Sequence, residues 1–100
     1  MGIEVYWKDE RGEILAGVED AGAFSGLGGL LYRQSGSVCL RFIDPAGDAC
    51  FNQRQLPILL MEFRQLLGQL NGRPRDHVQA IVDLLEGAAR VHTYIWFVGD

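Results

Sequence analysis

The sequence predicts an α+β domain of two layers, in which a helical hairpin packs on one face of an antiparallel or mixed sheet of about five strands. Three observations support this prediction. Segments near both ends of the chain alternate apolar and polar residues or are apolar throughout, as strands do. Two longer segments between residues 56 and 89 space their apolar residues three and four apart, as amphipathic helices do. No repeat or linker interrupts the 100 residues, so we expect one domain over 1–100.

Residues 3–18 are expected to form a β-hairpin. Apolar residues alternate with more polar ones on both sides of a short segment, 9–12, whose residues favour turns and which ends in Gly12. The alternating apolar positions are Ile3, Val5, Trp7, Ile14, Ala16 and Val18. The next segment, 19–37, contains many glycines, each of which would cost a helix about 1 kcal/mol relative to alanine. We therefore expect a loop there, with one short helical turn near Leu30.

The segment VCLRFI at 38–43 is apolar on both faces, which predicts a central strand paired with residues 49–52 as a hairpin. A helix is expected to follow, with Pro57 in its first turn and Asn71-Gly72 at its end. Pro74 is expected to open a second helix. The apolar stripe of this second helix is Val78, Ile81, Val82, Leu85, Ala88 and Ala89.

The last segment, HTYIWFV at 92–98, is expected to be a strand with two apolar faces. Such a strand must be covered on both sides. The helical hairpin can cover one side. The other side would need the glycine-rich segment, a partner protein or a second copy of the chain.

Composition and charge narrow the classes of partner. A formal net charge of −4 with only nine Lys and Arg residues argues against nucleic-acid binding, which requires a basic surface. An acidic domain is instead steered toward basic surfaces on other proteins. The first residues have no secretory signal pattern, and no apolar run approaches the ~18 residues of a membrane span. We expect a cytoplasmic protein with no membrane or nucleic-acid partner.

Metal and cofactor sites are not predicted. His77 and His92 lie too far apart in sequence to form a spaced ligand pair, and we expect His77 to be exposed and His92 to lie at a strand edge. The two thiols, Cys39 and Cys50, are expected to be buried in the sheet. The stretch GLGGLL has Leu31 where a dinucleotide-binding loop requires its third glycine.

The stretch RFIDPAGDACFNQ places Asp44, Asp48 and Asn52 at regular intervals, which raises the question of a cation site. A calcium loop that began at Asp44 would need other residues at three of its defining positions, which hold Ala46, Ala49 and Gln55. Asp-Pro-Ala-Gly instead fits a type I turn. We expect this turn to join the two strands of the hairpin and Asn52 to cap the helix that follows.

The stretches RFIDPAGDACFNQRQLP at 41–57 and YIWFVGD at 94–100, with the opening IEVYWKDERGE, resemble a family of small bacterial proteins. In that family a segment of the type R-F-I-D-P-x-G-D-x-x-F-N-x-x-Q precedes a leucine-rich helix, and an aromatic strand is followed by Gly-Asp. The residues 19–37 depart from the family pattern. The family has no assigned activity, so the resemblance implies a bacterial origin and no particular chemistry.

Two functional hypotheses follow. The first is a non-enzymatic interaction module whose partner is another protein or a second copy of the chain, because the last strand is apolar on both faces and no catalytic motif is found. The second is a small-ligand-binding protein or enzyme that uses Asp44, Asp48 and Arg41 at one end of the sheet. Most aromatic residues are expected in the core, with Trp7 as an exception. The candidate interaction or ligand residues are Trp7, Arg41, Asp44, Asp48, Trp96 and Asp100.

Overall fold

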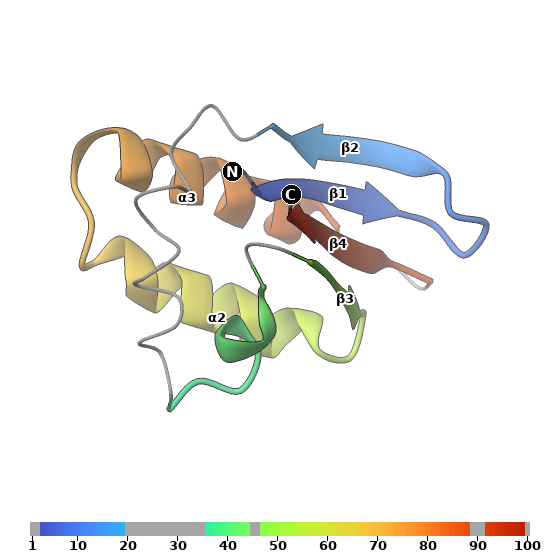
Figure 1. Cartoon of the computed structure of the whole chain (residues 1–100), viewed down its shortest axis with the longest axis horizontal. Helices are drawn as coiled ribbons and strands as arrows, with labels where there is room; N and C mark the ends of the chain where they lie inside the picture. Colours follow the sequence, from blue (N-terminus) through green and yellow to red (C-terminus); the bar gives the residue numbers. More distant parts are fainter. Residues whose placement is uncertain (1–2, 20–35, 45–46, 89–91, 100) are drawn as a thin grey trace.

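A computed structural model describes residues 3–19, 36–44, 47–88 and 92–99. In these residues a four-stranded antiparallel sheet has the order β2-β1-β4-β3, and two helices pack on one of its faces (Figure 1). The elements are β1 (Ile3–Lys8), β2 (Ile14–Val18), the 3₁₀ helix η1 (Leu40–Phe42), β3 (Asp48–Asn52), α2 (Leu56–Leu67), α3 (Gly72–Gly87) and β4 (Tyr94–Gly99). The predicted α+β class and helical hairpin are confirmed, with four strands instead of about five.

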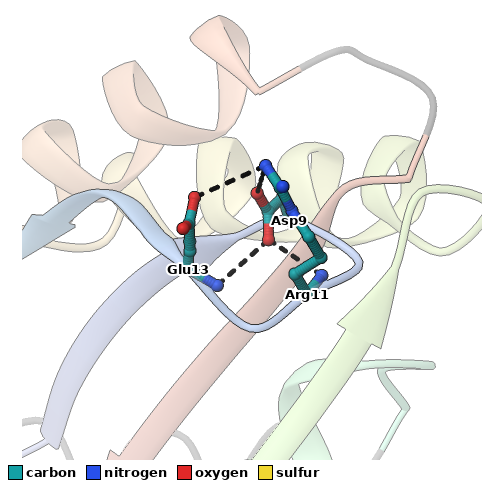
Figure 2. Close-up of polar contacts among 3 residues, drawn as sticks. All are labelled: Asp9, Arg11 and Glu13. Atoms are coloured by element: carbon teal, nitrogen blue, oxygen red, sulfur yellow. Dashed lines mark hydrogen bonds and ion pairs between the residues drawn. The ribbon is translucent and has the colours of Figure 1, made fainter.

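The hairpin of β1 and β2 forms around a turn held by one aspartate (Figure 2). The Asp9 Oδ1 atom accepts hydrogen bonds from the backbone N–H groups of Arg11 and Glu13, at 2.9 and 3.0 Å. The Arg11 guanidinium lies 3.8 Å from the Asp9 carboxylate and 3.6 Å from that of Glu13. Gly12 adopts a φ of 82°, which a glycine tolerates without strain, so the turn predicted at 9–12 is confirmed.

The strand predicted at 38–43 is wrong, because this segment contains η1. The buried carboxylate of Glu62 on α2 accepts the backbone N–H groups of Val38, Cys39 and Leu40, at 2.7, 2.8 and 3.2 Å. The Glu62 carboxylate therefore accepts the backbone N–H groups that residues 38–40 would donate to a neighbouring strand if they formed a strand themselves. The predicted hairpin of 38–43 with 49–52 is absent as a result, and β3 pairs with β4.

The burial pattern of residues 38–43 explains why the sequence predicted a strand there. Cys39, Leu40 and Ile43 are buried, whereas Val38 and Phe42 are exposed. Buried positions one and four residues apart follow a helical turn, not the two-residue period of a strand. In so short an apolar run the two periods cannot be told apart from sequence alone.

The entry to α2 is organised by two amide side chains. The Asn52 Oδ1 atom accepts the backbone N–H groups of Arg54 and Gln55, at 2.9 and 3.1 Å, and the Gln55 Oε1 atom accepts the Asn52 N–H at 2.9 Å. This reciprocal pair closes the turn between β3 and α2. The N-cap residue of α2 is Gln55 and has no side-chain capping bond, so the prediction that Asn52 caps the helix is wrong. The predicted helix boundary at 71–72 is wrong, because α2 ends at Leu67 and Gly72 begins α3, ahead of Pro74.

The core lies between the helices and the inner face of the sheet. Phe97 of β4 is at its centre, because its ring stacks on Phe63 of α2 with centroids 5.8 Å apart and makes a T-shaped contact with Phe51 of β3 with centroids 5.7 Å apart. The stripe predicted on α3 is buried from Val78 through Ala88, while Ala89 lies outside the described residues. The buried members are Val78, Ile81, Val82, Leu85 and Ala88.

His77 is buried, so the predicted exposure of this side chain is wrong. The cause is the early start of α3 at Gly72, which places His77 in the second turn of the helix instead of at its end. There it lies one residue before Val78 and four before Ile81, on the face that packs toward the sheet.

Candidate interaction face of the sheet

We call the face of the sheet opposite the helices the outer face. A row of paired residues crosses all four strands on this face. Tyr6 pairs with Gly17 of β2 and with Trp96 of β4, and Trp96 pairs with Cys50 of β3. Directly paired residues in an antiparallel sheet project to the same side. Phe97, the next residue along β4, is fully buried against the helices, so Trp96 projects away from them. We call Gly17, Tyr6, Trp96 and Cys50 the aromatic row.

Glycine at position 17 allows the ring of Tyr6 to lie across β2. A Cβ atom on Gly17 would be 3.0 Å from the Tyr6 Cδ1 atom and 3.3 Å from Cε1, which is closer than side chains normally approach. The Tyr6 hydroxyl donates a hydrogen bond to the Glu4 carboxylate at 2.5 Å. This bond raises the pKa of Tyr6, and desolvation and the negative charges of Glu4 and Glu19 raise it further. The ring is thus held at an acidic end of the outer face.

Trp96 is contacted by a cation from the neighbouring strand. The Lys8 Nζ atom lies 4.7 Å from the centroid of the Trp96 ring, a distance that gives a favourable cation–π interaction. Cys50 pairs with Trp96 on the other side. Desolvation raises the pKa of the Cys50 thiol, and the positive charge of Lys8 opposes that rise. The outer face therefore combines an aromatic centre with one lysine and a thiol that is protonated at neutral pH.

Cys50 is exposed, so the prediction that it is buried in the sheet is wrong. Cys39 is buried as predicted, but it lies at the start of η1 and not in a strand. β3 is an edge strand, and the residue at position 50 projects to the outer face, away from the helices. An alternating strand buries only the residues that face its covering layer.

An open pocket of about 320 Å³ lies beside the aromatic row. Its walls are formed by Lys8, Asp9, Glu10, Gly12, Cys50, Tyr94 and Trp96. The pocket lies between the hairpin turn and the beginning of β4. A second pocket, of about 250 Å³, lies around Asn52 and His92. Among the residues described, no group of three His, Cys, Asp or Glu side chains is placed to hold a metal ion.

The two tryptophans predicted as candidates lie on different sides of the sheet. Trp7 follows Tyr6 on β1, is half-buried and packs against the core cluster. Trp96 belongs to the aromatic row and lines the larger pocket. Asp100, also a candidate, lies outside the described residues.

The three polar candidates lie around the loop that precedes β3. Arg41 is exposed in η1 with its guanidinium carbon 4.9 Å from the centroid of the Phe42 ring, and Asp44 is exposed after η1. The Asp44 carbonyl accepts the N–H of Gly47 at 3.2 Å, which closes the predicted turn. That turn joins η1 to β3, so the prediction that it joins two strands is wrong. Asp48 is exposed at the start of β3, and neither pocket is lined by any of the three.

Sequence reasoning placed Tyr6 and Tyr94 with the core aromatic residues, which is wrong because both are half-buried outside the core, and it did not single out Lys8 or Cys50 as site residues. A signal was available, because the alternation in β1 and β4 already assigns Tyr6, Lys8 and Trp96 to faces opposite their buried neighbours. What the alternation lacks is the strand order. Only the pairing of β1 with β4 brings these side chains into one row.

No protein-family model matches the sequence, and searches of curated proteins and of solved structures found no match either. The resemblance to the bacterial family with the RFIDPxGD segment therefore stays a prediction. In the part of the chain that the structure describes, neither helix has the length and apolar character needed to cross a membrane.

Proposed function

We propose that this protein is a non-enzymatic interaction module that binds a protein partner through the outer face of its sheet. The observation that supports this proposal most strongly is the aromatic row, in which Tyr6 and Trp96 are neighbours on the face opposite the helices. Tyrosine and tryptophan contribute disproportionately to binding energy at protein interfaces. Their half-buried rings present apolar area at little cost in conformational entropy.

The charges around the row favour a partner with a basic surface. Two residues after Trp96 on β4, Val98 pairs with Glu4 of β1 and with Asp48 of β3. These pairs place two carboxylates on the outer face beside the aromatic row. The whole chain has a net charge of −4. Complementary charges increase the association rate and discriminate against acidic proteins. We infer a bacterial cytoplasmic protein whose partner is itself soluble.

The test compares three forms of the protein as bait in lysate from its source organism. Trp96→Thr removes the centre of the row and keeps a residue that favours strands. Met61→Gln is the matched control, because Met61 is an exposed apolar residue on α2, in the other layer. We expect a specific protein to be retained by the wild type and by Met61→Gln and lost with Trp96→Thr. The proposal is contradicted if all three forms retain the same protein equally, or if the wild type retains no specific protein.

The mass of the purified protein in solution distinguishes a foreign partner from a second copy. A monomer that retains a second protein supports the proposal as stated. A dimer that dissociates in Trp96→Thr would instead assign the outer face to self-association. Light scattering over a range of protein concentrations measures this directly.

The larger pocket supports a second candidate, the binding of a small aromatic anion. Lys8 supplies a positive charge, and Tyr94 and Trp96 supply apolar walls, whereas the carboxylates of Asp9 and Glu10 in the same lining oppose an anion. The test is tryptophan fluorescence in a Trp7→Phe background, so that only Trp96 reports. Titration with benzoate should quench Trp96, and Lys8→Met should weaken the effect. An unchanged signal at millimolar ligand removes this candidate.

A further inference from the structure

The edge of the sheet at β2 differs from the edge at β3 in what it presents to solvent. β3 carries Asp48 and Asn52 at its ends and an exposed Cys50 between them. All five residues of β2, from Ile14 to Val18, are apolar or glycine. Side-chain charges along an edge strand discourage pairing with other chains. β2 has none within the strand.

Two large apolar side chains of β2 are exposed, Ile14 at 57% and Leu15 at 45%. The register shifts between Trp7 and Lys8, so Leu15 falls between two paired positions on β2. α3 packs against β2. Among the described residues β2 pairs with β1 alone, so no described strand pairs with the N–H and C=O groups on its other side.

The charges at this edge lie at its two ends. Glu13 precedes β2 and Glu19 follows it, and both side chains are exposed. Glu13 also lies 3.6 Å from the Arg11 guanidinium, with which a partner's cation would share it. An antiparallel copy of β2 paired over its full length would be centred on Ala16. Glu13 of each copy would then face Glu19 of the other, and like charges directly opposite each other are destabilising. A second copy of the chain is therefore a poor occupant of this edge.

We infer that the edge of β2 binds an extended segment of a partner protein, in which basic residues flank a short β-forming stretch. This inference rests on the proposed function and names the chemistry of the partner. The segment would add a fifth strand beside β2, with backbone hydrogen bonds supplying affinity. Its terminal Lys or Arg residues would pair with Glu13 and Glu19. Because Gly17 of β2 lies under the Tyr6 ring, the added strand would extend the outer face next to the aromatic row.

The experiment uses NMR spectra of the ¹⁵N-labelled full chain and three synthetic peptides. The first has the sequence Lys-Thr-Val-Thr-Val-Thr-Lys, the second has Glu at both ends, and the third is the Lys peptide with alternate backbone nitrogens methylated. We expect the Lys peptide to shift the amide signals of residues 14–18. The Glu peptide should bind about fivefold more weakly, since two exposed ion pairs are lost. The methylated peptide should not bind, because its donors are blocked.

A charge-swapped variant provides the control. In Glu13→Lys/Glu19→Lys the order of the two unmethylated peptides should reverse. The inference is overturned if the signals of residues 14–18 do not move, if the charge swap leaves the order unchanged, or if the methylated peptide binds equally well. It is also overturned if these signals change on dilution of the wild type alone, which would assign the edge to a second copy.

The two proposals can fail separately. If Trp96→Thr abolishes partner retention but no peptide shifts the amide signals of residues 14–18, the proposed binding by the outer face is supported and the strand-addition inference fails. If the peptides bind as expected but Trp96→Thr retains the same proteins as the wild type, peptide binding at the edge of β2 is supported and the proposed binding by the outer face fails.

Discussion

The two faces of the sheet are made from the same strands but differ in what covers them (Figure 1). On the inner face, Phe97 has no exposed surface and contacts aromatic rings from α2 and β3. One residue earlier, Trp96 projects to the outer face, where it contacts the Lys8 ammonium and lines an open pocket. Both are large aromatic residues in one strand. Their chemical type does not tell them apart, and only the position of the helices buries Phe97 and leaves Trp96 half-buried on the other face.

The largest effect that this comparison predicts is on stability. Phe97→Ala should lower the free energy of unfolding by about 3–5 kcal/mol, because it leaves a cavity between α2 and the sheet. Trp96→Thr should cost far less, since its ring packs on only one side. Urea unfolding of both variants measures the difference. Equal losses would mean that the outer face is also part of the core.

The second prediction concerns Glu62, the buried carboxylate on the inner side. Glu62→Ala leaves the N–H groups of Val38, Cys39 and Leu40 without their acceptor and should cost about 3 kcal/mol. Glu62→Gln keeps one acceptor oxygen and should cost less. Hydrogen exchange at these three amides is the direct measurement. Unchanged protection in Glu62→Ala would show that η1 is held by apolar packing alone.

The third prediction compares the two thiols. Cys50 on the outer face should react with a thiol reagent in the native protein, whereas the buried Cys39 should react only after unfolding. Desolvation raises the pKa of both, and the charge of Glu62 raises that of Cys39 further. At a given pH each thiol therefore has a smaller thiolate fraction than a free cysteine, so Cys50 should react more slowly than a model thiol.

Measuring the rate from pH 7 to about pH 11 tests the sign of the shift, since the rate for Cys50 should still be rising where that of a free thiol, with a pKa of about 8.5, has levelled off. Lys8→Met removes the charge that lowers the pKa of Cys50, and it should slow the reaction further. Rapid labelling of Cys39 in the native state would contradict the packing of η1.

The smallest effect is expected at Tyr6. Its hydrogen bond to Glu4 stabilises the neutral phenol, so ultraviolet titration should place its ionisation above that of free tyrosine. Glu4→Gln removes both the strong acceptor and a negative charge, and the midpoint should fall. Glu13→Gln, at the other end of the hairpin, is the control and should leave the midpoint in place. A midpoint insensitive to Glu4→Gln would mean that the bond is not populated in solution.

Local chemistry made several elements predictable. The hairpin turn depends on Asp9 and Gly12, and the start of α2 depends on Asn52, Gln55 and Pro57. Both could be predicted because the interactions that form them lie within a few residues. The core face of α3 followed from apolar spacing. Failures occurred where a distant residue determined the outcome, as when Glu62 replaced a strand partner for residues 38–40.

The candidate face was predictable only in part. Trp96 was identified as a candidate, but Tyr6, Lys8 and Cys50 were not, and Trp7 lies on the side that packs against the core. Strand periodicity assigns residues to one face or the other without saying which strands are neighbours.

By itself, the sequence determined the α+β class, the first hairpin, the two helices and the apolar stripes that drive them together. These depend on periodicity, capping and turn residues, all of which act over a few positions. The tertiary structure alone decided the strand order, the conformation of residues 38–43 and the composition of the outer face. Those features arise from contacts between residues far apart in the chain, and local patterns carry no information about which distant groups will meet.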